Sequence, residues 1–316
     1  MKTITFRNIG GWLLVWACLW LFLAPVAKGE NRAVAPVEIV TGIAPLSFLV
    51  EKIGGERVRV ATLLPPGQDP HTFEPSPGQI GRLSRAGIYF SLEMPFERML
   101  LAKLPREEAG RPLIIDVGAG IAKLPMLEHH HHDKHHHHDK HRHHRDSGHH
   151  HGELDPHIWL GPPQLLVMAE HVLTGLVTID PDQAPAYRHN HARLQGEIEA
   201  VHRRNTERLA PFAGSSFYVY HPAFGYFAAA YQLRQQAVEL AGKTPTPRQL
   251  LNLVERARHD GVRVIFVQPQ FDQKSAATIA SSIDGEVVPL DPLASDVLAN
   301  LEKMAAKISA ALAEKP

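Results

Sequence analysis

From residue 36 onward, short runs of apolar residues alternate with segments in which apolar residues recur every three or four positions. The first pattern predicts buried strands, and the second predicts helices with one face in a core. In the first half, strands are expected at 37–41, 58–64, 87–92 and 112–117, and helices at 45–55, 79–85 and 96–104. Such alternation is typical of βαβ units, so the sequence predicts an α/β domain with a mainly parallel sheet.

The same alternation resumes after Pro211. Strands are expected at 216–220, 234–239, 262–267 and 286–290, and helices at 223–231, 247–259, 274–283 and 293–312. No repeat of sequence is evident beyond this rhythm. The pattern therefore predicts a second α/β domain, so that the chain would consist of two Rossmann-like βα domains.

A longer helical pattern separates the two domains. A helix is expected at 164–178, and another at about 183–210 from a stripe formed by Tyr187, His191, Leu194, Ile198, Val201, Asn205 and Leu209. At 1.5 Å per residue the second helix would be roughly 40 Å long, and such a helix can join two domains rigidly. We expect a first domain over 36–180, a linking helix over 181–210 and a second domain over 211–316.

The N-terminal segment has the three parts of a secretory signal. Lys2 and Arg7 precede an apolar run over 12–23, and small residues follow near Gly29. We expect residues 1–29 to be a signal peptide that is cleaved on export to the periplasm. An uncleaved anchor is the alternative, although the run is shorter than the roughly 20 residues that span a bilayer. Cys18, the only cysteine, lies in the run, so the mature chain would have no disulfide and no thiolate ligand.

The charge balance of the chain is ordinary, whereas its histidine content is unusual. With 33 basic and 33 acidic residues, the formal net charge is zero when histidine is neutral, and nothing in it favours nucleic acid or an anionic membrane surface. Histidine is the unusual component, because fourteen of the 22 histidines fall between His129 and His151. This run is internal and is interrupted by acidic and basic residues, so it is taken as native rather than as an affinity tag.

The histidine-rich loop, 129–151, is far longer than usual connections between elements, which marks it as functional, disordered or both. Its imidazoles lack a fixed geometry. We hypothesise that the loop collects zinc, or senses its excess, at several weak and exchangeable sites. The alternative is a solvated linker that binds metal only because it is rich in histidine.

The eight remaining histidines fall into two groups. Five lie in helical segments and are expected to be ordinary solvated or packed residues: His171, His189, His191, His202 and His259. His71, His157 and His221 each sit just past a strand or at a proline-bounded turn, and Asp291 follows the strand at 286–290. Ligands of open α/β sheets bind beyond the carboxyl ends of the strands, so these four residues predict a metal site in the cleft between the domains. The alternative is that the histidines only cap turns.

Three imidazoles and one carboxylate suit Zn²⁺, which takes nitrogen and oxygen donors in tetrahedral geometry. Mg²⁺ and Ca²⁺ prefer oxygen, whereas Mn²⁺ and Fe²⁺ are weaker competitors for the same donors. Four protein ligands would leave little room for the open position of a catalytic zinc, and no HExxH motif is present, so a carrier is favoured over a zinc hydrolase. Asp155 either orients His157 or caps its turn.

Four motifs resemble one known family over nearly the whole mature chain. They are Pro70-His71 with Glu74-Pro75-Ser76, the segment 155–160 (DPHIWL), the segment 221–226 (HPAFGY) and the segment 290–293 (LDPL). These resemble the zinc-binding components of bacterial ABC importers, the cluster A-I solute-binding proteins, and most of all their ZnuA-type branch. The resemblance implies that the histidines of the first three motifs are metal ligands and that an acidic residue of the last can complete the site. Manganese binders of the family commonly have Glu in place of His221.

Two departures from the family pattern stand out. Gln268 precedes Pro269-Gln270-Phe271 where the family often has Glu, and no cysteine is available for the disulfide that some zinc members carry. The resemblance implies a monomeric, non-enzymatic periplasmic protein that delivers Zn²⁺ to an ABC permease with its cytoplasmic ATPase. The alternatives are a manganese or iron carrier of the same family and a periplasmic zinc buffer without a permease.

Overall fold

The computed structural model describes residues 35–104, 111–126, 154–239, 246–271 and 273–314. The expected signal peptide and the histidine-rich loop lie outside these residues. Residues 36–316 belong to one compact unit, and it contains two parallel four-stranded sheets. Among the described residues, no helix is both long enough and apolar enough to cross a membrane.

The first sheet contains β1 (Val37–Thr41), β2 (Val58–Thr62), β3 (Ile88–Ser91) and β4 (Leu113–Asp116), in the order β2-β1-β3-β4. All neighbours are parallel, with Val37 opposite Val58 and Ile88 opposite Leu113. The connections carry α2 (Ala44–Gly54), α3 (Pro77–Leu83) and α4 (Pro95–Ala102). Each of these helices has a proline in its first turn, where the missing N–H costs no hydrogen bond.

The second sheet has the same topology. It contains β5 (Ser216–Val219), β6 (Arg234–Ala237), β7 (Val264–Val267) and β8 (Glu286–Pro289), in the order β6-β5-β7-β8, again all parallel. Its helices are α7 (Gly225–Ala230), α8 (Pro247–His259), α9 (Gln273–Ser282) and α10 (Val297–Ala313). The two predicted parallel-sheet domains are therefore confirmed.

The last helix begins later than the sequence pattern suggests. It was expected from residue 293, but α10 begins at Val297 because the side chain of Asp296 caps it by accepting from the N–H of Ala299 at 3.0 Å. Residues 293–296, which the pattern assigned to the helix, instead belong to the loop after β8. This loop carries Asp291.

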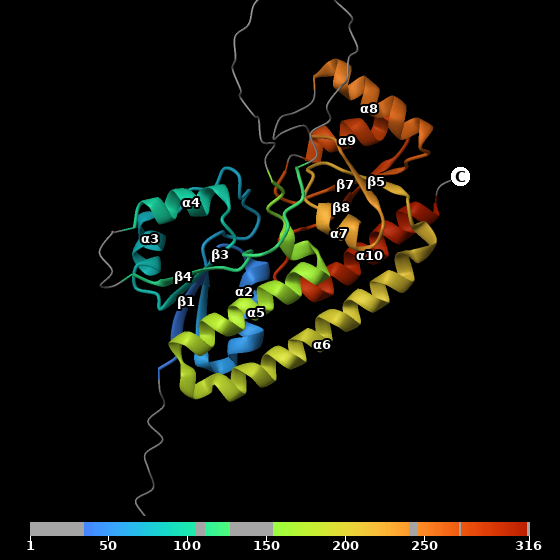
Figure 1. The fold of residues 1–316 in the computed structure, drawn as a ribbon. Coiled ribbons are helices and arrows are strands. Elements are labelled where there is room, and N and C mark those ends of the chain that lie inside the picture. Colours follow the sequence, from blue (N-terminus) through green and yellow to red (C-terminus); the bar gives the residue numbers. More distant parts are fainter. Residues whose placement is uncertain (1–34, 105–110, 127–153, 240–245, 272, 315–316) are drawn as a thin grey trace, which may run out of the picture. The chain divides into compact units, whose positions relative to one another are not determined.

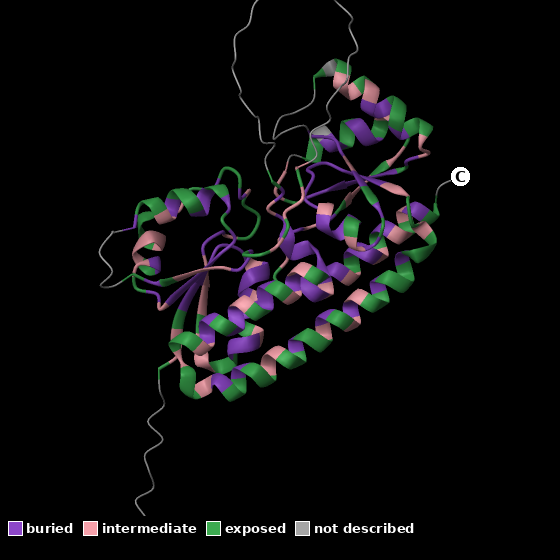
Figure 2. Cartoon of the chain, viewed as in Figure 1, coloured by how far each residue is buried: buried purple, intermediate pink, exposed green. Residues whose placement is uncertain are grey.

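Two long helices lie between the sheets in the sequence (Figure 1). They are α5 (Pro162–Ile179) and the 26-residue α6 (Ala184–Leu209), which packs against α5, α2 and α10. The buried residues of α6 are Ala184, Tyr187, Leu194, Ile198, Val201, Asn205 and Leu209, which is nearly the predicted stripe. Figure 2 shows the complementary exposed residues along the same helix. The long helix expected from the sequence is confirmed.

One hydrophobic core reaches across both halves. The same cluster includes Ile39 of the first sheet, Val219 of the second, and Leu194 and Leu301 of α6 and α10. A second, smaller cluster lies around α8 and α9 in the second half. Because the main core is continuous, the domain boundaries drawn at 180 and 211 stay a prediction.

Candidate metal centre

His221 lies two residues past the end of β5, and its backbone is fixed by a glutamine that directly follows the neighbouring strand β7. The side chain of Gln268, which is fully buried, accepts from the His221 N–H at 3.2 Å and donates to the His221 carbonyl at 2.6 Å. The neutral amide both accepts and donates here, whereas an ionised glutamate can only accept. This pairing gives the departure from the family's usual Glu a structural role.

The ring of His221 is held on two sides. Its Nδ1–H donates to Glu239 Oε2 at 2.9 Å, and its face stacks on Phe271 with 4.8 Å between ring centroids. Burial lowers the pKa of His221 and outweighs the hydrogen bond to Glu239, which raises it. Burial thus favours the neutral form of the ring, and with Nδ1–H engaged by Glu239 that form presents the lone pair of Nε2.

His157 is oriented by Asp155, which serves both functions expected from the sequence. Asp155 Oδ1 accepts from the His157 backbone N–H at 2.9 Å and from Nδ1 at 2.7 Å, and both residues are 2% exposed. On the far side, the hydroxyl of Tyr226 donates to the Asp155 carbonyl at 3.0 Å. The glycine of the 221–226 motif permits this approach, because a Cβ on Gly225 would lie 2.7 Å from Asp155 Oδ2.

His71 lies in the loop after β2, in a turn shaped by Asp69. Asp69 Oδ1 accepts from the His71 backbone N–H at 2.9 Å. Two residues on, Phe73 is buried against Phe96 of α4, with ring centroids 5.3 Å apart, so the loop is attached to the first half. His71 itself is exposed. Its Nε2 lies 3.2 Å from the Nε2 of His221.

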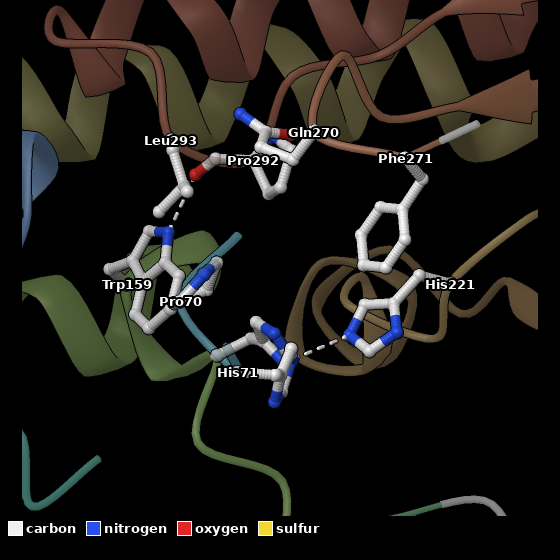
Figure 3. Close-up of a pocket in the computed structure, with 9 residues that line it drawn as sticks. Pro70, His71, Trp159, His221, Gln270, Phe271, Pro292 and Leu293 are labelled. Carbon is white, nitrogen blue, oxygen red and sulfur yellow. Dashed lines mark hydrogen bonds between the residues drawn. The ribbon is translucent and has the colours of Figure 1, made fainter. Parts of the chain in front are cut away.

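The structure brings these three histidines together. One ligand nitrogen from each lies within 4.8 Å of the others. Ligands at 2.0–2.1 Å from a tetrahedral zinc stand about 3.3 Å apart, close to the 3.2 Å between His71 and His221. The rings line a cavity with about 10 Å³ of space for the centre of a water-sized sphere, enough for one water molecule or ion (Figure 3). The arrangement can bind a single cation.

Asp291 lies outside the group of three histidines. Its Oδ1 accepts from the Leu293 N–H and from Gln270 Nε2, both at 2.9 Å. It lines a different cavity of about 410 Å³, together with Thr62, Gly67 and other residues. Gln270 lines both cavities. As a metal ligand, Asp291 stays a prediction.

Several residues around the site were not predicted from the sequence as part of it. Glu239 follows β6, while Gln270 and Phe271 follow β7, so each lies at the carboxyl edge that indicated the histidines. Examining the residues that follow the carboxyl end of every predicted strand would have found them. Among the described residues, none of the five helical histidines belongs to the three-histidine group.

The ends of the segment that carries the histidine-rich loop meet near His157. Pro125 and Leu154 form an isolated antiparallel bridge, and the Asp155 N–H donates to the Leu124 carbonyl at 2.8 Å. The hydroxyl of Tyr226 accepts from the Leu124 N–H at 2.9 Å. The chain therefore leaves and re-enters the described structure beside one of the three histidines.

Sequence comparisons connect this chain to proteins of metal uptake. Residues 39–315 match the family described as zinc-uptake complex component A, periplasmic. The high-affinity zinc uptake system protein ZnuA of Bacillus subtilis is 26% identical over 301 residues, which cover 91% of this chain and 89% of that protein. The zinc-binding lipoprotein AdcA of Streptococcus pneumoniae is 26% identical over 285 residues, or 90% of this chain. The chain spans about half, 55%, of the length of AdcA.

Solved structures show the same architecture. A crystal structure of ZnuA has a TM-score of 0.76 at 33% identity, over 88% of this chain and 99% of that one. A zinc-bound deletion mutant of ZnuA has a TM-score of 0.77, also at 33% identity, over 89% of this chain and 100% of that one. TroA of Treponema pallidum, a periplasmic zinc-binding protein, has a TM-score of 0.73 at 17% identity, over 88% and 99% of the chains, and this likeness concerns the fold alone.

Proposed function

Because the chain belongs to the ZnuA family of periplasmic zinc-uptake components, we propose that it is the zinc-binding component of an ABC importer. It captures one Zn²⁺ ion through His71, His157 and His221 and delivers it to a permease in the inner membrane, which works with a cytoplasmic ATPase. The observation that carries this proposal is the convergence of three imidazoles on one ion-sized cavity.

The donor set supports zinc as the cargo. Neutral imidazole nitrogen suits Zn²⁺, while Mn²⁺ and Fe²⁺ bind the same donors more weakly in the general affinity order. Manganese or iron carriage is the alternative within the family. A fourth ligand from Asp291, as the sequence suggests, would require its Oδ1 to give up its bonds from Gln270 and Leu293.

The two carboxylates behind the rings support tight binding. Asp155 and Glu239 hold His157 and His221 by their Nδ1 atoms, which fixes both the tautomer and the direction of the metal-binding nitrogen. Zinc binds to neutral imidazole, so its affinity falls as the solution becomes acidic. The long helix α6 limits domain motion, and the permease releases the ion by drawing the ligands of the two halves slightly apart.

The cellular setting follows from the family and the N-terminal sequence. The chain is exported by a cleaved signal at 1–29, acts in the periplasm as a monomer, and catalyses no reaction. The histidine-rich loop, 129–151, supplies weaker, exchangeable sites that collect zinc or sense its excess. A zinc buffer without a permease is the competing role, and genomic adjacency to a permease and an ATPase would separate the two.

The test is an equilibrium zinc titration against a competing chelator, with mature protein that lacks residues 129–151 and with manganese as the second metal. We expect one tight zinc per chain that excess manganese does not displace. His221→Ala should abolish this site, whereas His259→Ala, at an exposed position on α8, should leave it intact. If no tight site remains without the loop, the histidine run itself is the binding element and the proposal is wrong.

A further inference from the structure

A cavity of about 460 Å³ lies on the first sheet, apart from the three histidines. Its charged lining residues are Glu38 of β1, Arg59 of β2, Arg82 of α3 and Arg85 in the turn after α3, and we call it the arginine pocket. Glu38 and Arg59 are the second residues of parallel strands, whereas His71 follows the carboxyl end of β2. The arginine pocket and the metal centre therefore lie toward opposite edges of this sheet.

The floor of the arginine pocket is apolar. In the register of β1 and β2, Glu38 lies opposite Arg59 and Val40 lies opposite Ala61. Because side chains alternate between the two faces of a strand, these four residues share one face of the sheet. Val40 is 1% exposed, and Ala86, which follows α3, is 8% exposed. The pocket thus combines small apolar side chains with three guanidinium groups.

Only one of these guanidinium groups has a carboxylate partner in the pocket. Arg59 Nη1 lies 2.6 Å from Glu38 Oε1, and Glu38 is the only acidic residue among the described residues that line the cavity. Arg82 and Arg85 have no side-chain hydrogen bond or ion pair with any described residue. They are three residues apart, a spacing at which like charges repel on a helix. Three guanidinium groups and one carboxylate leave the pocket a charge of +2, in a chain whose formal net charge is zero.

The end of α3 does not use these arginines. Basic side chains near a helix C-terminus can hydrogen-bond its last carbonyls. In α3, however, the carbonyls of residues 80, 82 and 83 accept from the N–H groups of residues 84, 85 and 86. The carbonyl of Gly81 accepts from the Ser84 hydroxyl at 3.0 Å. The last four carbonyls are thus satisfied, and the guanidinium groups of Arg82 and Arg85 stay available to a ligand.

The chemistry of the pocket suits a phosphate group. The planar fork of a guanidinium matches phosphate oxygens with two parallel hydrogen bonds, and two unpaired forks can neutralise the two charges that a phosphate monoester carries at about pH 8. A bare phosphate ion would leave most of the cavity of about 460 Å³ empty, and this volume is within the range of small-molecule sites. The apolar floor can take the remainder of a larger molecule.

We propose that the arginine pocket binds a small organic phosphate, with Arg82 and Arg85 holding the phosphate group and the apolar floor contacting the organic part. Soluble phosphate esters and phospholipid headgroups share this chemistry. The inference does not rest on the proposed function, because no described residue lines both this pocket and the three-histidine cavity. It gives the first half a second ligand besides its part in the metal centre.

The test compares two double variants that lose the same charge. Arg82→Gln/Arg85→Gln removes both unpaired guanidinium groups of the pocket, whereas Arg188→Gln/Arg203→Gln removes two from exposed positions on α6. Calorimetric titration of the metal-free, full mature chain at about pH 8 keeps histidine neutral, with glycerol 3-phosphate as the soluble probe. We expect the first variant to bind this probe at least about tenfold more weakly, because one hydrogen bond of a charged group is itself worth about tenfold or more. The second variant should bind it as the unmodified protein does.

Sedimentation with vesicles of phosphatidylglycerol, and of phosphatidylcholine for comparison, separates the two sources. Binding of glycerol 3-phosphate that only Arg82→Gln/Arg85→Gln loses assigns a soluble ligand. Binding of phosphatidylglycerol with the same dependence, without binding of the soluble ester, assigns a headgroup. Binding of neither probe, or equal losses in the two double variants, overturns the inference.

Two further measurements keep this result independent of folding and of the metal centre. Zinc affinity should be equal in all these proteins, because none of the substituted arginines lines the three-histidine cavity, so either result leaves the carrier standing. The melting temperature verifies folding. Arg82→Lys/Arg85→Lys, which keeps the charges but removes the forks, replaces a glutamine variant that does not fold, and it should also bind the probe more weakly than the unmodified protein.

Discussion

Each half of the molecule places one buried glutamate near the carboxyl edge of its sheet. In the first half, Glu97 of α4 is fully buried, and its carboxylate accepts from the Tyr89 hydroxyl at 2.8 Å and from two backbone N–H groups of the β3–α4 turn at 2.9 Å each. In the second half, Glu239 is 5% exposed and accepts from the His221 ring at 2.9 Å. One carboxylate completes a turn, and the other orients a ring in the candidate metal centre.

Glu97 and Glu239 are both buried near the end of a strand, but they differ in the groups that donate hydrogen bonds to them. Burial raises the pKa of Glu97, a perturbation that is often used to find functional sites. Yet its hydrogen-bond partners among the described residues all lie within 89–94, and Gly42 makes room for it, since a Cβ there would collide with the carboxylate. Glu239 instead reaches a ring 18 residues earlier in the chain, whose other nitrogen faces the cavity. A buried glutamate near a strand end can thus stabilise a turn in one half and orient a metal-binding histidine in the other.

Removing the first carboxylate should have the largest effect on stability. Glu97→Ala leaves two buried N–H groups without an acceptor at about 1–3 kcal/mol each, so we expect the free energy of unfolding to fall by about 2–6 kcal/mol. Zinc affinity of the folded protein should stay unchanged, because Glu97 does not line the three-histidine cavity. Urea denaturation of the metal-free protein and a zinc titration measure the two quantities. Glu51→Ala, at an exposed position on α2, is the control, and weakened zinc binding without loss of stability would contradict the assigned role.

Removing the carboxylate of Glu239 should lower zinc affinity strongly and stability less. Glu239→Ala frees the Nδ1 side of His221, and loss of such a partner typically lowers metal affinity by about 10–100-fold. We expect a smaller loss of stability than in Glu97→Ala, because one ring rather than a whole turn loses its partner. Chelator competition measures the affinity, with Glu286→Ala at an exposed position of β8 as the control. Zinc affinity equal to that of the unmodified protein would show that Glu239 does not support the ligand.

The comparison also explains how far the sequence could predict the site. His71, His157 and His221 were found because each histidine adjoins a proline at a strand end or turn, and these are local features of the sequence. The two sheets and α6 were predicted for the same reason, since apolar periodicity is local. The contacts of Glu239 and Gln270 are not local, because their partners lie 18 and 21 residues away and no spacing rule gives a contact across strands. Asp291 as a ligand stays a prediction from its strand-end position, and the contacts of its Oδ1 with Gln270 and the Leu293 N–H could not be read from the sequence.

The contributions of Glu97 and His221 to stability should change in opposite directions with pH. Burial raises the pKa of Glu97 above 4.5, so the folded state holds that proton more firmly, and the contribution of Glu97 to stability falls as the pH rises through its folded pKa. Burial lowers the pKa of His221 below 6.5, so the unfolded state takes up more protons below that pH. The contribution of His221 is therefore complete above pH 6.5 and is lost as the pH falls from there through the folded pKa.

We expect the metal-free protein to lose stability on acidification below pH 6.5. His221→Gln should make this loss shallower, because the variant has no buried imidazole at that position to protonate. Urea midpoints measured between about pH 5 and 8 would show it. The control is His259→Gln, at an exposed site, which should follow the unmodified protein. Parallel curves for His221→Gln and the unmodified protein would exclude His221 as the source.

The smallest effects are expected for the surface ion pairs that the linking helix α6 makes with the two halves. A surface ion pair joins α6 to α2 in the first half, where Lys52 lies 2.9 Å from Glu197. Another joins α6 to α10 in the second half, where Arg204 lies 2.6 Å from Glu302. All four side chains are at least 36% exposed, so solvent screening should leave each pair a coupling free energy of about 0–1 kcal/mol. Double-mutant cycles with Lys52→Met and Glu197→Gln, and with Arg204→Met and Glu302→Gln, measure the two couplings.

The buried stripe of α6 should hold the helix far more strongly than either ion pair. Leu194 is 1% exposed in the main core, and its replacement by Ala should cost about 2–5 kcal/mol, against at most about 1 kcal/mol for an ion pair. Because the same core cluster contains residues of both sheets, this attachment is shared by the two halves. Two small and similar couplings would therefore mean that α6 joins the halves through apolar packing. One coupling well above the other would mean that a single half fixes the helix, and the ligands carried by the other half would then be the more displaceable ones.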